Sequence, residues 1–124
     1  MKITREPGDA ISAPADRFTG DVWMWERIGA TAHTEVRMVL FTPGARSAWH
    51  CHPAGQVLHV TAGAGLVQSR GGEREEMRVG DTVTAAPGEW HWHGAAPGKF
   101  MVHLAVTDGT TEWAKHVTDE EYKG

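Results

Sequence analysis

The sequence predicts an all-β fold of the sandwich or barrel type. Fifteen glycines and six prolines interrupt the chain at short intervals, and the runs between them are rich in branched and aromatic residues. No helical periodicity separates these runs, which argues against alternating strands and helices. The expected strands cover residues 22–28, 34–41, 56–62, 65–69, 75–79, 81–86 and 99–106.

The two ends of the chain differ from this pattern. We expect residues 1–20 to form an irregular arm that packs on the barrel or on a neighbouring subunit. Residues 110–122 are expected to form a helical tail, because Trp113 and Val117 lie four positions apart and would share one helix face. A length of 124 residues suits one domain, so residues 1–124 are interpreted as a single domain.

Composition disfavours several classes of partner. The formal net charge is −4 and the basic residues are scattered, so neither nucleic acid nor a membrane surface is expected to bind. No run of 18 apolar residues is present, and the first ten residues lack the apolar stretch of a signal peptide. With the single cysteine Cys51, these features indicate a cytoplasmic location.

The segment WHCHPAGQ, which begins at Trp49, has the pattern of a metal site. Alternate residues of a strand share a face, so His50 and His52 point one way while Cys51 points the other. The following Pro-Ala-Gly turn reverses the chain and can bring Gln56 beside the two histidines. Two imidazoles on one strand face rarely serve packing alone, so we interpret this cluster as ligands.

A second cluster, HWH, has the same geometry. His91 and His93 share a face, and both clusters adjoin a turn that contains proline and glycine. The remaining histidines have no such context: His33, His59 and His116 are interpreted as ordinary surface or core residues. Cys51 is expected to be a buried small residue rather than a nucleophile, because the sequence offers it no paired base.

These residues resemble the two motifs of the cupin family. The first, G(X)5HXH(X)3-4E(X)6G, is matched by Gly44, His50, His52 and Gly63, with Gln56 in place of the glutamate. The second, G(X)5PXG(X)2H(X)3N, is matched by Gly80, Gly88 and His91, with Ala86 and Ala95 in place of the proline and the asparagine. The motif core spans residues 44–95, and the resemblance implies a single conical β-barrel of the jelly-roll type.

A closer resemblance is to the small bacterial cupins with hydroxynitrile lyase activity, carried by GARSAWHCHPAGQ, PGEWHWHGAAP, HLAV and EWAKHVTDEEY. It implies a divalent metal, with Mn²⁺ the usual ion of that group and Fe²⁺, Co²⁺, Ni²⁺ or Zn²⁺ also compatible with the ligand types. The implied ligands are His50, His52, Gln56 and His91. His93 and His103 would lie near the metal as candidate catalytic residues, and the pocket would be lined by Arg37, Val39 and Thr107. Arg37 departs from the group, because a small residue is expected at that position.

Three functions follow from this interpretation, and the sequence leaves them open. The first is a carbon–carbon lyase that cleaves or forms cyanohydrins, with the metal as Lewis acid and a neutral histidine, His103 or His93, as base. The second is a metal-dependent oxidoreductase of the dioxygenase type. The third is a non-catalytic binder of small anions in which Arg37 is the clamp.

His103 and Arg37 can also be interpreted as residues without a functional role, and the family resemblance further suggests an oligomeric state. His103 could be a hydrogen-bonded core histidine, and Arg37 could be a solvated residue at the rim of the barrel. Since small cupins usually pair through their sheets, we expect a homodimer or a homotetramer.

Overall fold

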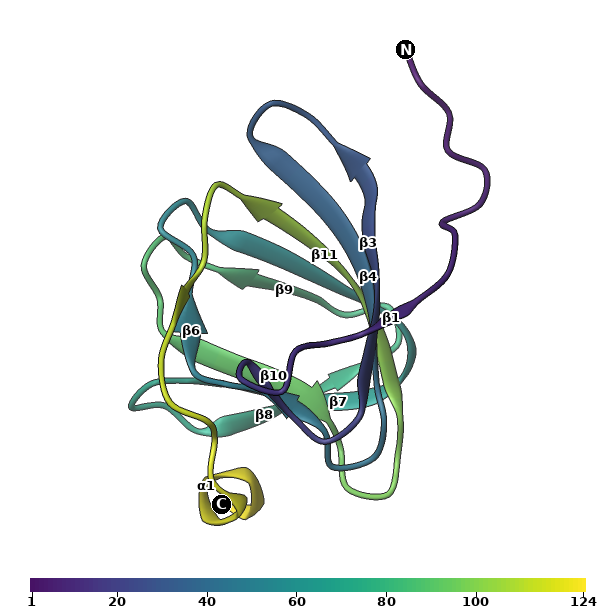
Figure 1. Ribbon diagram of the computed structural model, residues 1–124. Helices are drawn as coiled ribbons and strands as arrows, with labels where there is room; N and C mark the ends of the chain where they lie inside the picture. The colour runs from purple at the N-terminus through teal and green to yellow at the C-terminus, as the bar shows by residue number, and fades with distance from the viewer.

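The computed structural model describes the backbone of residues 1–124 and every side chain other than that of Arg27. The described chain forms twelve β-strands and one short helix. The strands curl into two sheets that face one another, with the helix below them and the N-terminal segment leading away from the body (Figure 1). The expected all-β barrel is therefore confirmed, and a short helix lies at its C-terminal end. The strands are β1 (Ile11–Ser12), β2 (Phe18–Thr19), β3 (Val22–Ala30), β4 (Thr34–Phe41), β5 (Arg46–Ser47), β6 (His50–Cys51), β7 (Gln56–Ser69), β8 (Arg74–Arg78), β9 (Thr82–Ala85), β10 (His91–Ala95), β11 (Met101–Asp108) and β12 (Glu112–Trp113).

The long strand β7 belongs to both sheets and joins them. Its first half pairs with β11 and β9, and its second half pairs with β10 and β8, always antiparallel. Gly63, at φ +73, lies between the two halves, and a Cβ there would collide with the carbonyl of Phe100. The runs expected at 56–62 and 65–69 are thus one continuous strand that bends at a glycine.

One sheet has the order β1-β3-β4-β11-β7, and the other contains β10, β5 and β2, with β6 paired to β10 and β12 paired to β6. Their inner faces enclose the main core, as the alternating burial of β11 illustrates: Met101, His103 and Ala105 are buried, whereas the residues between them are more exposed. The core members are Phe18, Val22, Met24, Val39, Phe41, Ala45, Val60, Met77, Ala95 and Met101.

A second apolar cluster lies between the outer side of β10 and the C-terminal helix. Trp92 is fully buried there, packs on Tyr122 at a ring separation of 5.9 Å, and donates from Nε1 to Gln68 Oε1 at 2.9 Å. Trp49, Leu66 and Val117 complete the cluster. Trp49 and Trp92 therefore pack on the other side of the strands that carry the histidines, because they alternate with these histidines along the chain.

The tail is helical over a shorter range than the expected 110–122. The helix α1 spans Asp119–Lys123, where Thr118 and Glu121 form a capping box. Upstream, Glu112 and Trp113 pair with Cys51 and His50 of β6 as strand β12. The prediction of a longer helix was wrong, because Trp113 and Val117 pack in two different places rather than on one helix face.

The N-terminal arm is more ordered than the irregular segment expected at residues 1–20. Ile11 and Ser12 pair with β3, and Phe18 and Thr19 pair with β5. Phe18 is buried in the main core, so this end of the arm is part of the barrel. Within the described chain, no helix is long and apolar enough to cross a membrane.

Candidate metal centre and pocket

The floor of the site is formed by three adjacent strands, β4, β11 and β7. The register places His103 opposite Val39, Ala105 opposite Arg37, and Thr107 opposite Gln56. Because paired residues of neighbouring strands point to the same side, these side chains face a common space. The wall across from them carries the histidines of β6 and β10, where His91 pairs directly with His50.

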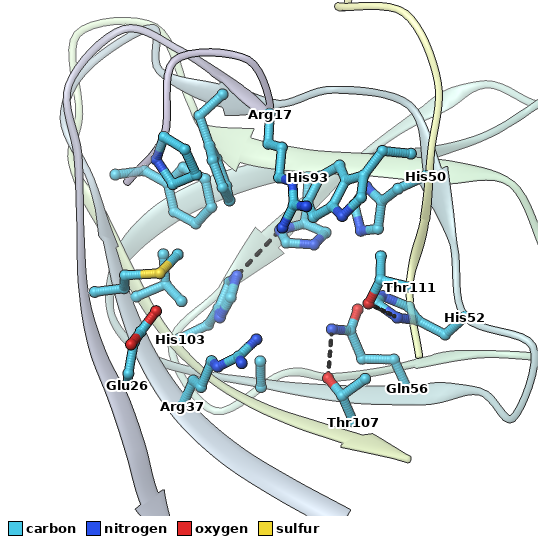
Figure 2. A pocket seen from close by; sticks show the side chains of 17 residues that line it. Arg17, Glu26, Arg37, His50, His52, Gln56, His93, His103, Thr107 and Thr111 are labelled. Atoms are coloured by element: carbon cyan, nitrogen blue, oxygen red, sulfur yellow. Dashed lines mark hydrogen bonds between the residues drawn. The ribbon is translucent and has the colours of Figure 1, made fainter. Parts of the chain in front are cut away.

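Four histidine rings meet on this wall. The ring centroids of His50 lie 4.4 Å from His91, 5.0 Å from His52 and 5.1 Å from His93, and those of His52 and His91 are 5.5 Å apart. All four residues are buried. The histidine clusters 50/52 and 91/93 are therefore adjacent in space, and Gln56 points toward them from the floor (Figure 2).

Hydrogen bonds fix the orientation of each expected ligand from behind. Nδ1–H of His50 donates to the carbonyl of Ala48 at 2.8 Å, and Nδ1–H of His91 donates to the carbonyl of Glu89 at 2.8 Å. A carbonyl can only accept, so the Nε2 lone pair of both rings is free. His91 Nε2 is buried with no hydrogen-bond partner among the described residues. A histidine that binds a metal through one ring nitrogen usually donates a hydrogen bond from the other one, as these two rings do.

His52 and Gln56 are held in the same way by two threonines. His52 Nδ1 is hydrogen-bonded to Thr111 Oγ1 at 3.0 Å, and Gln56 Nε2 donates to Thr107 Oγ1 at 2.9 Å (Figure 2). The other polar atom of each side chain, His52 Nε2 and Gln56 Oε1, is buried and lacks a partner within the described chain. Buried polar atoms are rarely left unpaired, so this group of inward lone pairs fits a cation.

The electrostatics of the wall also suit a cation. Burial lowers the pKa of His50 well below its ordinary value, with the neighbouring His91 as the next cause. Burial likewise lowers the pKa of His52 to about 4 and lowers the pKa of His91. The rings are consequently neutral near pH 7, and their lone pairs remain available to a metal.

His93 and His103 form a pair deeper in the barrel. His103 Nε2 and His93 Nδ1 are 3.1 Å apart, and the ring of Phe41 contacts both imidazoles. Burial lowers the pKa of His93 well below its usual range and lowers the pKa of His103 to about 4, so both are neutral. His93 Nε2 and His103 Nδ1 are buried and unpaired within the described residues.

The proton shared by this pair can lie on either histidine, and its position decides whether His93 can be a metal ligand. If His103 donates, its Nδ1 is a free base and His93 Nε2 carries a hydrogen, so His93 cannot bind a metal. If His93 donates instead, its Nε2 lone pair is free and His103 has no basic nitrogen facing the pocket. The donor atoms of His50, His91 and His93 lie within 4.8 Å of one another and form a three-histidine site suitable for a metal. The set expected from the sequence replaces His93 with His52 and Gln56.

The site opens into a cavity of about 130 Å³. Arg37, Val39 and Thr107 are among the residues that line it, and Arg37 enters it beside His103 (Figure 2). Arg37 is half-buried, so the solvated-rim interpretation holds for only part of its side chain.

Several residues of the pocket were not predicted from the sequence, and two of them contact His50 and His52 directly. Trp113 stacks on His50 at 4.7 Å, and Thr111 supports His52. Both residues belong to the segment that was expected to be helical. A helix there would not place them beside β6, so the sequence analysis did not assign them to the pocket. The backing carbonyls of Ala48 and Glu89 carry no side-chain signal at all.

The residues interpreted as ordinary lie away from the pocket lining. His33, His59 and His116 are exposed, and His59 hydrogen-bonds to Thr82 on the outer face. Cys51 is buried, and its thiol points to Glu112, with Sγ 3.6 Å from the carboxylate. Burial, followed by the charge of Glu112, raises the pKa of this thiol, which suits a structural cysteine and not a nucleophile.

Comparison with known proteins agrees with this architecture. Residues 37–108 match the family described as "Cupin domain". The chain is 51% identical over 130 residues to an (R)-mandelonitrile lyase of Granulicella tundricola, covering 99% of each protein.

Two solved structures illustrate the range of the fold. A cupin-like protein of Thermotoga maritima superposes with a TM-score of 0.87 at 41% identity, over 90% of each chain. The polyketide cyclase RemF of Streptomyces resistomycificus superposes with a TM-score of 0.77 at 16% identity, over 99% of this chain and 92% of that one, and this likeness concerns the fold alone.

Proposed function

This chain belongs to the cupin family, and we propose that it is a metal-dependent carbon–carbon lyase of the hydroxynitrile lyase type. One observation supports this most strongly: several buried side-chain atoms without hydrogen-bond partners, among them His52 Nε2 and Gln56 Oε1, line the same small pocket as the neutral His103, whose Nδ1 also lacks a partner among the described residues. The lyase activity in the name of a relative that is 51% identical over nearly the whole chain supports the same reaction class.

We propose that His50, His52, Gln56 and His91 hold the metal. In each of these residues one polar atom of the side chain, Nδ1 in the histidines and Nε2 in Gln56, is hydrogen-bonded to a backbone carbonyl or to a threonine hydroxyl. Nδ1 of His93 is instead hydrogen-bonded to another histidine, His103. Three imidazoles and an amide carry no charge, so a bound divalent ion would keep its full charge and supply a strong Lewis acid for an anionic group. Mn²⁺ is the proposed ion, on the basis of the resemblance.

In the proposed reaction His103 removes the hydroxyl proton of a cyanohydrin. The O–H electron pair forms the carbonyl of the aldehyde, the C–C bond to the nitrile carbon breaks, and its electron pair leaves with cyanide. The proton held on His103 Nδ1 then passes to cyanide and yields hydrogen cyanide, so atoms and charges balance. In this role Nε2–H of His103 donates to His93 Nδ1, which fixes the tautomer that the base requires.

The pocket itself contributes orientation and the exclusion of water. Phe41 and Val39 are buried beside His103 and give this end of the pocket an apolar wall. Thr107 and Thr111 hold two of the expected ligands, Gln56 and His52, by hydrogen bonds. Burial lowers the pKa of His103 to about 4, so the ring is unprotonated near pH 7 and its lone pair can accept a proton.

Cyanide release from racemic mandelonitrile tests this proposal. Metal-loaded protein should release cyanide, favour one enantiomer and need no oxygen, whereas chelator-treated protein should release only the background amount. Equal release with and without metal would refute the metal dependence. Metal-dependent oxygen uptake without cyanide release would move the assignment to an oxidoreductase.

A further inference from the structure

Arg37 has features of a ligand-binding residue that the lyase reaction does not use. Its Nε is buried and has no hydrogen-bond partner among the described residues. The side chain nevertheless lines the cavity and enters it next to His103 (Figure 2). A buried guanidinium N–H without an acceptor is unfavourable, so the geometry favours a ligand that supplies one.

The neighbours of Arg37 make room for it over the floor of the pocket. Arg37 lies opposite Ala105 of β11, whose methyl group leaves the guanidinium free to extend between His103 and Thr107. Residues diagonally placed on adjacent antiparallel strands are about 7–8 Å apart, so Arg37 lies near the proposed base without replacing it. An acceptor at Arg37 would thus be a few bonds away from the reacting carbon.

The ion pair of Arg37 with Glu35 leaves most of its donors available. One nitrogen, Nη2, lies 2.7 Å from Glu35 Oε2, at a place where both side chains are about one-third exposed. Such a pair contributes little and occupies one of five N–H groups. Among the charged residues of the lining, Arg17 and Arg37 outnumber Glu26 by two to one, a net charge of +1 with neutral histidines.

We propose that Arg37 forms a carboxylate subsite, and that the preferred substrates are small cyanohydrins and aldehydes that carry a carboxylate a few carbons from the reacting centre. This inference rests on the proposed lyase function and names its substrate class. Arginine binds carboxylates through paired, charge-assisted hydrogen bonds. A cavity of about 130 Å³ is close in size to an engineered cavity that holds benzene, so a four-carbon aldehyde acid suits it.

The first test compares cyanide addition to 4-oxobutanoate and to butanal, which differ mainly in the carboxylate. The ratio of kcat/KM values for the two aldehydes should favour 4-oxobutanoate in the native protein. It should fall at least about tenfold in Arg37→Gln, the loss expected for one charge-assisted contact. The ratio for Arg37→Lys should lie between those of the native protein and Arg37→Gln, because lysine keeps the charge but cannot form two parallel hydrogen bonds to a carboxylate.

Arg78→Gln is the matched control, since it removes an arginine from an exposed pair with Glu76 and should leave the ratio unchanged. Arg17→Gln tests the other arginine of the lining. A ratio that survives Arg37→Gln, or that falls only in Arg17→Gln, would overturn the assignment to Arg37.

A binding measurement separates this inference from the lyase proposal. Calorimetric titration of the metal-loaded protein with 4-hydroxybutanoate, which has no aldehyde group, should give binding that weakens at least about tenfold in Arg37→Gln. The neutral 1,4-butanediol should not distinguish the two proteins. If neither aldehyde reacts but this difference holds, the carboxylate subsite stands and the lyase proposal fails. If both aldehydes react but the two proteins bind 4-hydroxybutanoate equally, the subsite is refuted.

Discussion

Replacing His52 by alanine should abolish stoichiometric metal binding while the barrel remains folded. His52 would supply one of four ligand atoms, and its ring is oriented by Thr111. Losing a group that merely supports a ligand typically weakens metal affinity 10–100-fold, so losing the ligand itself should exceed about 100-fold, or about 3 kcal/mol. After dialysis, metal content would be measured by mass spectrometry, with circular dichroism as the test of folding.

His93→Ala is the comparison that makes this experiment decisive. His93 belongs to the alternative set with His50 and His91, whose donor atoms lie within 4.8 Å of one another. Under the proposed ligand set, His93→Ala should bind metal with an affinity within about tenfold of the native value. The substitution removes only the hydrogen-bond partner of His103 Nε2 and no ligand atom. Retention of metal by His52→Ala together with its loss in His93→Ala would refute the reasoning about the backing hydrogen bonds.

The remaining predictions concern support, acidity and assembly. Thr111→Val should weaken metal binding about 10–100-fold by removing the partner of His52, and unchanged affinity in a competition titration would deny Thr111 this role. Folding lowers the pKa of His103 from its ordinary value of 6.5 to about 4, so the unfolded chain takes up the proton first and stability falls as the pH drops from about 6.5 to 4. At pH 5 this amounts to about 2 kcal/mol, and urea unfolding of chelator-treated protein should show a pH dependence that is smaller by that amount in His103→Gln. An equal pH dependence in both proteins would exclude His103 as its source. We also propose that the chain forms a homo-oligomer through the outer face of β3, β4 and β11, where Trp23, Leu104 and the exposed Val106 present an apolar surface. Trp23→Glu should then reduce the mass measured by light scattering, whereas a monomeric native protein would refute the assembly.

Sequence periodicity was sufficient to predict most of the barrel. Strand β4 begins and ends where the alternation placed it, and β11 buries the face that carries His103. Alternation within a strand has a period of two and reports which residues share a face, so the common face of His50 and His52 and that of His91 and His93 could also be expected. The approach of the two clusters depends on the pairing of β6 with β10. The glycine bend in β7 could not be expected, because it depends on the proximity of Phe100 from a distant segment.

Sequence patterns could not predict the conformation of the C-terminal tail or the hydrogen bonds that support the expected ligands. Trp113 and Thr111 acquire their roles only when β12 pairs with β6, an interaction between segments about sixty residues apart. The proton between His93 and His103 is likewise invisible in the sequence, although it decides which histidines are ligands. The sequence indicates that Arg37 is an unusual residue at its position, but only its pairing with Ala105 shows that the guanidinium has room above the floor of the pocket.

The most direct test of the proposed mechanism is the turnover of (R)-mandelonitrile by His103→Gln at native metal content. Loss of a general base typically lowers the rate by about 10²–10⁴-fold, and a decrease of that size with unchanged metal stoichiometry would support His103 as the proton acceptor. The same variant should lose the dependence of kcat on a group that titrates at acidic pH. Native turnover by a metal-replete His103→Gln protein would contradict the proposed mechanism and leave His103 as a hydrogen-bonded core residue.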